Sequence, residues 1–213
     1  NDKTAYNAPL YGSGNTNDPL HSSNANEVQS LEVLTNKFLN NIGIPANKLV
    51  MGLPFYGKLF KNVATGSSPI PSLPGLFVNA PRDAANGCNN PRPPMGPWDP
   101  APCETSGSTE YCDLAGVVGT NAHHYLNIDG TLKSSAQSAG WARYWDNTCK
   151  VPYLYNAALN QFISYDDQQS ITEKVNFINS LNLAGGMVWE LSQDERTTSA
   201  LLSTINSAFN TTP

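Results

Sequence analysis

An aromatic residue and a carboxylate stand side by side where an apolar run stops. Residues 185–189 read GGMVW, which has the length and apolar character of a buried strand, and Glu190 follows Trp189 at once. A carboxylate at a strand end is a candidate for general acid or base chemistry. The indole beside it can either contact a ligand or close the core. The elements around this pair must decide between the two interpretations.

Two adjacent carboxylates, Asp166 and Asp167, stand just ahead of a helical pattern. An aspartate at the beginning of a helix accepts hydrogen bonds from free backbone N–H groups and complements the positive end of the helix dipole. We therefore interpret this pair as helix capping rather than as catalytic machinery.

The four cysteines, Cys88, Cys103, Cys112 and Cys149, lie in the region that is richest in proline and glycine. Their spacings fit no zinc pattern, and no glycine-rich phosphate loop stands between a strand and a helix. The sequence therefore predicts neither a metal nor an organic cofactor. It predicts two disulfides in an oxidising compartment, and all three pairings stay open.

The charge balance excludes some classes of partner. The chain has 213 residues and a formal net charge of −5, and its 12 Lys and Arg residues are scattered. Phosphate backbones attract concentrated positive charge, so we expect no nucleic-acid partner. No apolar run approaches the ~18 residues that a membrane span needs. We expect a secreted, extracellular protein with no membrane partner.

Alternating helices and strands must position the candidate residues. Apolar spacing predicts a helix over 26–42, a strand over 49–54, a helix with the capping box 170–173, a strand over 185–189 and a helix over 197–209. Two shorter strand-like runs, 151–156 and 161–167, predict a hairpin. Alternation of this kind indicates a parallel sheet with helices outside it, whose strands are covered on both faces.

Three stretches in this order resemble the closing part of a glycoside hydrolase family 18 chitinase: KLVMGLPFYGK (48–58), VPYLYNAALNQFISYDD (151–167) and AGGMVWELSQD (184–194). The resemblance implies an α/β fold, namely the C-terminal portion of a (β/α)8 TIM barrel with strands seven and eight and helices six to eight. It also implies an α+β insertion domain over 58–165, between barrel segments over 1–57 and 166–213.

The resemblance implies six substrate-binding residues for chitin or a chitooligosaccharide: Trp189, Tyr56, Lys58, Asp146, Met187 and Glu190. Trp189 would be the floor on which a sugar ring stacks, because the C–H face of a sugar buries apolar area against an indole. Lys58 stands where many members carry an arginine, and a point charge does not reproduce a guanidinium fork. Glu190 would lie beside the floor without being the proton donor.

The acidic signature of the family, D-x-x-D-x-D-x-E, does not occur in these 213 residues. In the family its final Glu is the proton donor, and the acetyl group of the substrate serves as the nucleophile. We therefore predict no catalytic residue in this chain and no chitinase activity for the chain alone. The complete enzyme would hydrolyse β-1,4-N-acetylglucosamine linkages with retention, with the N-terminal part of the barrel as the partner of this chain.

Two other interpretations stay open. A non-catalytic chitinase-like lectin would keep the sugar groove without the acid. An inhibitor or interaction module would instead use the insertion domain, where Trp98, Trp141, Tyr144 and Trp145 could form an aromatic contact surface.

Overall fold

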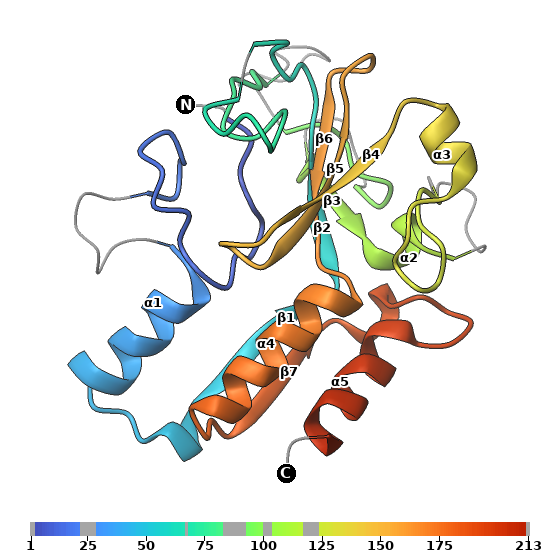
Figure 1. Ribbon diagram of the computed structural model, residues 1–213. Helices are drawn as coiled ribbons and strands as arrows, with labels where there is room; N and C mark the ends of the chain where they lie inside the picture. The colour runs from blue at the N-terminus through green and yellow to red at the C-terminus, as the bar shows by residue number, and fades with distance from the viewer. Residues whose placement is uncertain are drawn as a thin grey trace.

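The computed structural model describes residues 3–21, 29–66, 68–82, 93–99, 104–116 and 124–211. It contains two sheets, a parallel pair and a sheet of five strands. Figure 1 shows the five-stranded sheet in the upper half and the parallel pair below it, beside two helices. Within the described ranges no helix is both long enough and apolar enough to cross a membrane. Its two sheets and the helices beside them make the chain an α/β protein.

The parallel pair joins two strands that are far apart in the sequence, β1 (Val50–Pro54) and β7 (Gly185–Trp189). In their register Gly52 lies beside Met187, and Pro54 lies beside Trp189. The predicted strands at 49–54 and 185–189 are thus confirmed, and they are direct neighbours. Because both strands run in the same direction, their carboxyl ends meet at one edge.

The two faces of this pair differ. On one face Met51 and Leu53 are buried in a core shared with helices α4 (Gln168–Ser180) and α5 (Ala200–Asn210). Side chains alternate between faces along a strand, and Val50 on the other face is 50 % exposed. The prediction that these strands are covered on both faces is therefore wrong for the described part of the chain.

The second sheet has the order β3-β2-β6-β5-β4 and is antiparallel throughout. Its strands are β2 (Tyr56–Phe60), β3 (Ser108–Glu110), β4 (Ala142–Asp146), β5 (Val151–Asn156) and β6 (Gln161–Ser164). Strands β5 and β6 form the predicted hairpin. The short helices α2 (Tyr111–Leu114) and α3 (Ser134–Ser138) follow β3 and precede β4. Only Phe55 separates β1 from β2, so the two sheets are joined directly.

The N-terminal helix is shorter than predicted. Helix α1 (Leu31–Asn36) begins after its N-cap Ser30 and continues as a π-helical turn over Lys37–Asn41. The expected start at residue 26 falls outside the described residues. Its predicted apolar face is not buried, since Phe38 is 40 % and Ile42 is 58 % exposed. The apolar period therefore identified the face correctly, but among the described residues only Leu31 at its start packs against the core, and Leu34, Phe38 and Ile42 stay exposed.

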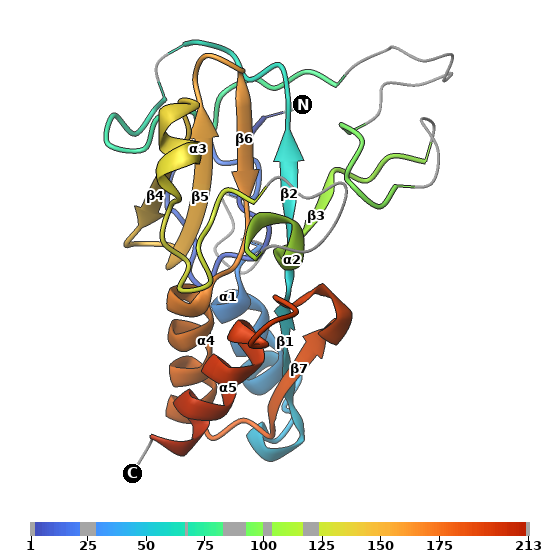
Figure 2. The same ribbon diagram turned by 90° about the vertical axis from the view of Figure 1, so that its right-hand side faces the viewer.

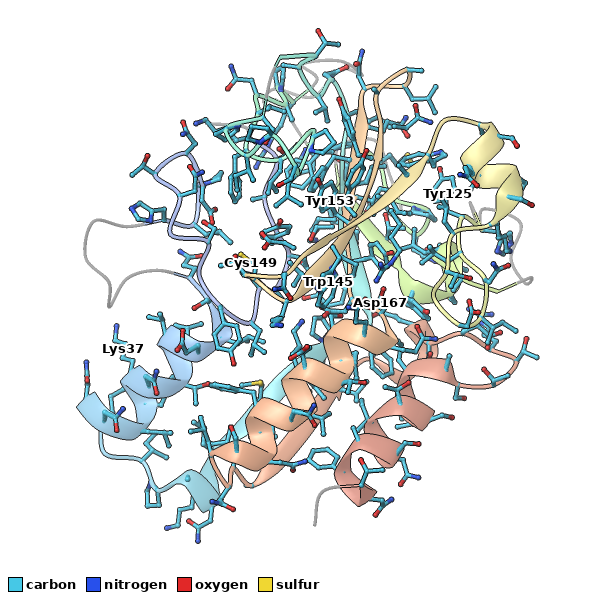
Figure 3. The ribbon with its side chains drawn as sticks, in the orientation of Figure 1. Lys37, Tyr125, Trp145, Cys149, Tyr153 and Asp167 are labelled. Atoms are coloured by element: carbon cyan, nitrogen blue, oxygen red, sulfur yellow. The ribbon has the colours of Figure 1, made fainter. Side chains whose placement is uncertain are left out.

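Helix α4 begins at Asp167, whose carboxylate accepts hydrogen bonds from the backbone N–H groups of Gln169 at 3.0 Å and Ser170 at 3.1 Å. The capping prediction is thus confirmed for Asp167 alone, whereas the predicted cap at Ser170 is wrong by one turn. Figure 3 labels Asp167 where α4 meets the five-stranded sheet. The other member, Asp166, forms a buried ion pair with Lys174.

Two of the four cysteines contradict the disulfide prediction. Cys112 in α2 and Cys149 after β4 are buried and free. Burial raises the pKa of the Cys112 thiol to about 12, and the adjacent Asp113 carboxylate acts in the same direction. Cys88 and Cys103 lie outside the described residues. The cysteines of the described chain therefore give no support to an oxidising compartment.

Candidate functional site

Trp189 ends β7 on the open face of the strand pair. It is 61 % exposed, and Met187, two residues earlier on the same face, is 48 % exposed. The Trp189–Glu190 peptide bond is cis. The carbonyl oxygen of Trp189 accepts the backbone N–H of Phe55 at 3.0 Å, which holds the neighbouring Tyr56 at the same edge. The structure thus places Trp189 and Met187 on one face, with the backbone of Tyr56 at the same strand edge, and so exposed an indole does not close the core.

Glu190 shapes the turn that follows Trp189. It is the N-cap of a 3-10 turn over Leu191–Gln193. Its carboxylate accepts a hydrogen bond from the Ser192 hydroxyl, and its backbone N–H donates to Gln193 Oε1 at 3.0 Å. The Glu190 side chain is exposed, next to Trp189 in the chain. These contacts give Glu190 a local structural task.

Lys58 lies two residues after Tyr56 on β2 and is half-buried. Its Nζ donates to Ser108 Oγ at 2.7 Å and to the carbonyl of Ser106 at 3.3 Å, and it lies 5.7 Å from the centre of the Tyr56 ring. Burial lowers the pKa of Lys58, and the carboxylate of Asp99 opposes this shift. The ammonium is therefore held beside the Tyr56 ring rather than free in solvent.

Asp146 lies deeper than a cleft residue should. It is 4 % exposed. Its carboxylate accepts hydrogen bonds from the Tyr6 hydroxyl at 2.8 Å and from the backbone N–H of Thr148 at 2.8 Å. Asn7, which follows Tyr6 in the chain, donates from Nδ2 to the carbonyl of Tyr56 at 3.1 Å. The segment at Tyr6 and Asn7 thus lies between Asp146 and the strand-end site.

A cavity of about 260 Å³ lies away from the aromatic pair. It is lined by the far end of β2 and by residues that include Lys3, Lys61, Arg82 and Pro93. Lys58 contributes to its wall, but Tyr56 and Trp189 do not. Trp189 and Met187 instead lie on an exposed face of the strand pair.

Trp98 and Asp113 form a contact near the turn after β7 that no sequence motif indicates. Trp98 is 51 % exposed, and its Nε1–H donates to both carboxylate oxygens of Asp113, at 3.1 and 3.0 Å. Arg196, in the loop after β7, lies 6.0 Å from the centre of the Trp98 ring. Figure 2 shows α2, which carries Asp113, next to that loop. The only sequence signal was the aromatic residue itself.

Asp113 also predicts a pH dependence. Burial raises its pKa to about 6, and the Glu110 carboxylate adds to the shift, while the hydrogen bonds and Arg196 oppose it. Because the folded-state pKa lies above that of the unfolded chain, Asp113 stabilises the fold at low pH, and this contribution is lost as the pH rises through about 6. We therefore expect Asp113→Asn to gain stability relative to the parent chain between about pH 5 and about pH 7.5. Urea unfolding midpoints at both pH values measure it, and a difference that does not change with pH would contradict the assignment.

The interaction-module interpretation required four aromatic residues on one surface. Trp141 is instead 3 % exposed and packs on Tyr125 with ring centres 4.3 Å apart. Tyr144 stacks on the buried Tyr153 at 5.1 Å. Figure 3 labels Tyr125, Trp145 and Tyr153 among the side chains. The expected aromatic surface is therefore wrong, because Trp141 is buried in the core that also contains Leu53 and residues of α4 and α5.

An exposed indole at the carboxyl edge of two parallel strands, next to a five-stranded antiparallel sheet, defines an α/β protein with an exposed aromatic surface at a strand edge. The model of glycosyl hydrolases family 18 matches residues 1–194. The chain therefore belongs to glycosyl hydrolase family 18.

Individual relatives agree with this assignment. Chitinase ChiA of Flavobacterium johnsoniae is 57 % identical over 212 residues, which cover 98 % of this chain and 13 % of that protein. Chitinase B of Serratia marcescens is 30 % identical over 171 residues, 79 % of this chain and 29 % of that protein. Chitinase ChiA74 from Bacillus thuringiensis superimposes with a TM-score of 0.72 at 31 % identity, over 100 % of this chain and 30 % of that one. The chain thus spans less than a third of the length of these relatives.

Proposed function

We propose that this chain is the C-terminal part of the catalytic domain of a chitinase that hydrolyses β-1,4-N-acetylglucosamine linkages by substrate-assisted retention. The observation that carries the proposal is Trp189, a tryptophan that is 61 % exposed at the end of a strand whose opposite face is packed on helices. Together with Met187 it forms an exposed apolar patch, and such patches often mark ligand-binding grooves. Membership of the family supports chitin as that ligand.

The open face of the strand pair supports a barrel. We assign β1 to strand seven, β7 to strand eight, and α4 and α5 to the two helices that follow them. On the open face, Val50 is 50 % and Met187 is 48 % exposed, and further apolar area is exposed on α1. In a closed barrel these side chains lie against the preceding strands and helices. The N-terminal part of the barrel is therefore the proposed partner of this face.

The proposed roles follow from the contacts. Trp189 is the stacking floor, with Met187 beside it on the inner face. Tyr56 forms the side wall, and Lys58 orients the Tyr56 ring and offers a hydrogen bond to a sugar hydroxyl. Asp146 acts indirectly, as a positioning residue: its carboxylate accepts a hydrogen bond from Tyr6 and so holds the segment that lies between Asp146 and the site.

Residue Glu190 is proposed to fix the turn beside the sugar.

We place the enzyme outside the cell, because chitin is an insoluble polymer that must be cut before it can be taken up.

The acid motif does not occur among the 213 residues, so we expect the chain alone to bind chitin oligosaccharides without cleaving them. Titration with N-acetylglucosamine hexamer should quench tryptophan fluorescence, while reducing-end release stays at the level of a matched blank. Release above the blank would overturn the placement of the proton donor outside this chain. No change in fluorescence would overturn the sugar-binding surface.

A chitinase-like lectin is the second candidate. Its support is the exposed aromatic surface itself, since binding needs only the aromatic wall and no proton donor. The two candidates share this surface and differ in the proton donor alone.

A further inference from the structure

The amide of Gln193 uses both of its ends. Its Oε1 accepts the backbone N–H of Glu190 at 3.0 Å, and its Nε2 donates to Glu110 Oε1 at 3.2 Å. The first contact is local, and the second joins residues that are 83 positions apart. One side chain therefore connects the turn after β7 to the inserted sheet.

These contacts belong to a closed circuit around the aromatic site. Glu110 is paired with Tyr56 in the register of β3 and β2. Tyr56 follows Phe55, whose N–H donates to the carbonyl of Trp189 at 3.0 Å. The chain then runs from Trp189 through Glu190 to Gln193, and the Gln193 side chain donates a hydrogen bond to Glu110, which closes the circuit. The circuit thus contains both the proposed floor and the proposed side wall.

The floor needs such a connection. Trp189, Glu190, Leu191 and Ser192 are all exposed, so packing does little to fix them. Of the side-chain hydrogen bonds described for residues 190–193, only the one from Gln193 to Glu110 reaches another part of the chain.

We propose that Gln193 is a positioning residue, which clamps the turn after Trp189 to Glu110 and so fixes the indole floor relative to Tyr56. The inserted sheet would then set the geometry of sugar binding as well as forming its wall. This inference rests on the proposed sugar-binding function.

The chemistry of the pair predicts which exchanges are tolerated. A glutamate at position 193 could still accept the N–H of Glu190, but it would face the Glu110 carboxylate with no proton to share. Arg196 lies beside the Trp98 ring and its charge reaches Asp113, so it offsets part of this repulsion. A glutamine at position 110 keeps a carbonyl oxygen for Gln193 Nε2. In the exchanged pair, Glu110→Gln with Gln193→Glu, the contact between the two side chains is restored with its donor and acceptor reversed, and the side chain at position 193 still accepts the N–H of Glu190.

The test is a double-mutant cycle in the 213-residue chain, with affinity for N-acetylglucosamine hexamer measured by calorimetry. We expect Gln193→Glu to weaken binding about tenfold, Glu110→Gln to weaken it less than about twofold, and the exchanged pair to return within about twofold of the parent chain. Ser192→Ala is the matched control, because it removes only a bond inside the turn. It should leave the affinity unchanged.

Amide hydrogen exchange without sugar gives a second, independent measurement. Because repulsion from Glu110 should displace the side chain of Gln193→Glu, the Glu190 N–H should lose its acceptor and exchange faster in this variant. It should recover protection in the exchanged pair, while the melting temperature changes little. Parent-like exchange and affinity in Gln193→Glu, or no recovery in the exchanged pair, would overturn the clamp. If the parent chain binds no sugar but the exchange pattern holds, the proposed function fails and the clamp does not.

Discussion

Replacing Lys174 with alanine is expected to remove about 3 to 5 kcal/mol from the free energy of unfolding. Lys174 and Asp166 are 0 % and 1 % exposed, and the ammonium donates directly to Asp166 Oδ1. The second oxygen, Oδ2, has no hydrogen-bond partner among the described residues. Alanine would therefore leave a buried carboxylate whose remaining support is the Ser170 hydroxyl, at 2.7 Å from Oδ1.

The pH dependence of this loss separates charge burial from lost packing. Burial raises the pKa of Asp166, and Lys174 opposes the shift. Without Lys174 the folded-state pKa rises further, so protonation relieves the variant as the pH falls. We expect a smaller loss at about pH 5 than at about pH 8, measured by urea unfolding. Asp166→Asn combined with Lys174→Met should recover most of the stability.

Lys150→Ala is the matched control for this experiment. Lys150 pairs with Glu173 at 3.6 Å and both side chains are partly exposed, so the loss should stay below about 1 kcal/mol. Equal losses in Lys174→Ala and Lys150→Ala would contradict the importance of burial.

The sequence could predict elements whose order and partners are local. The hairpin of β5 and β6 and both parallel strands were found from apolar runs and their spacing, since such runs determine which residues leave water. The period of α1 also marked an apolar face, yet Leu34 on that face is 45 % exposed. Periodicity shows which side chains avoid water and says nothing about what covers them.

The site divides along the same line. The positions of Trp189 at the end of β7 and of Tyr56 just after β1 could be predicted, because each residue follows an apolar run with a family motif around it. Glu110 and Gln193 could not, because their contact depends on where β3 docks beside the turn after β7. Asp146 was placed in the cleft from its motif, but the Tyr6 hydroxyl that covers it is 140 positions away in the sequence. Contacts of this kind exist only once both sheets are assembled.

Replacing Trp189 with alanine is expected to weaken binding of N-acetylglucosamine hexamer by about 30-fold to 100-fold. The indole supplies most of the flat apolar area at the strand end, and no neighbouring aromatic residue on β7 can take its place. Calorimetry measures the loss without relying on the fluorescence that the substitution removes. Trp189→Phe should retain part of the affinity, because a smaller ring still stacks on a sugar face.

Stability provides the second readout for this substitution. Trp189 is 61 % exposed, so its truncation should change the free energy of unfolding by less than about 1 kcal/mol. Leu191→Ala is the matched control, since Leu191 is 62 % exposed in the same turn but offers no ring. Its affinity should remain within about twofold of the parent chain. Similar losses in Leu191→Ala and Trp189→Ala would mean that exposed apolar area, and not ring stacking, holds the sugar.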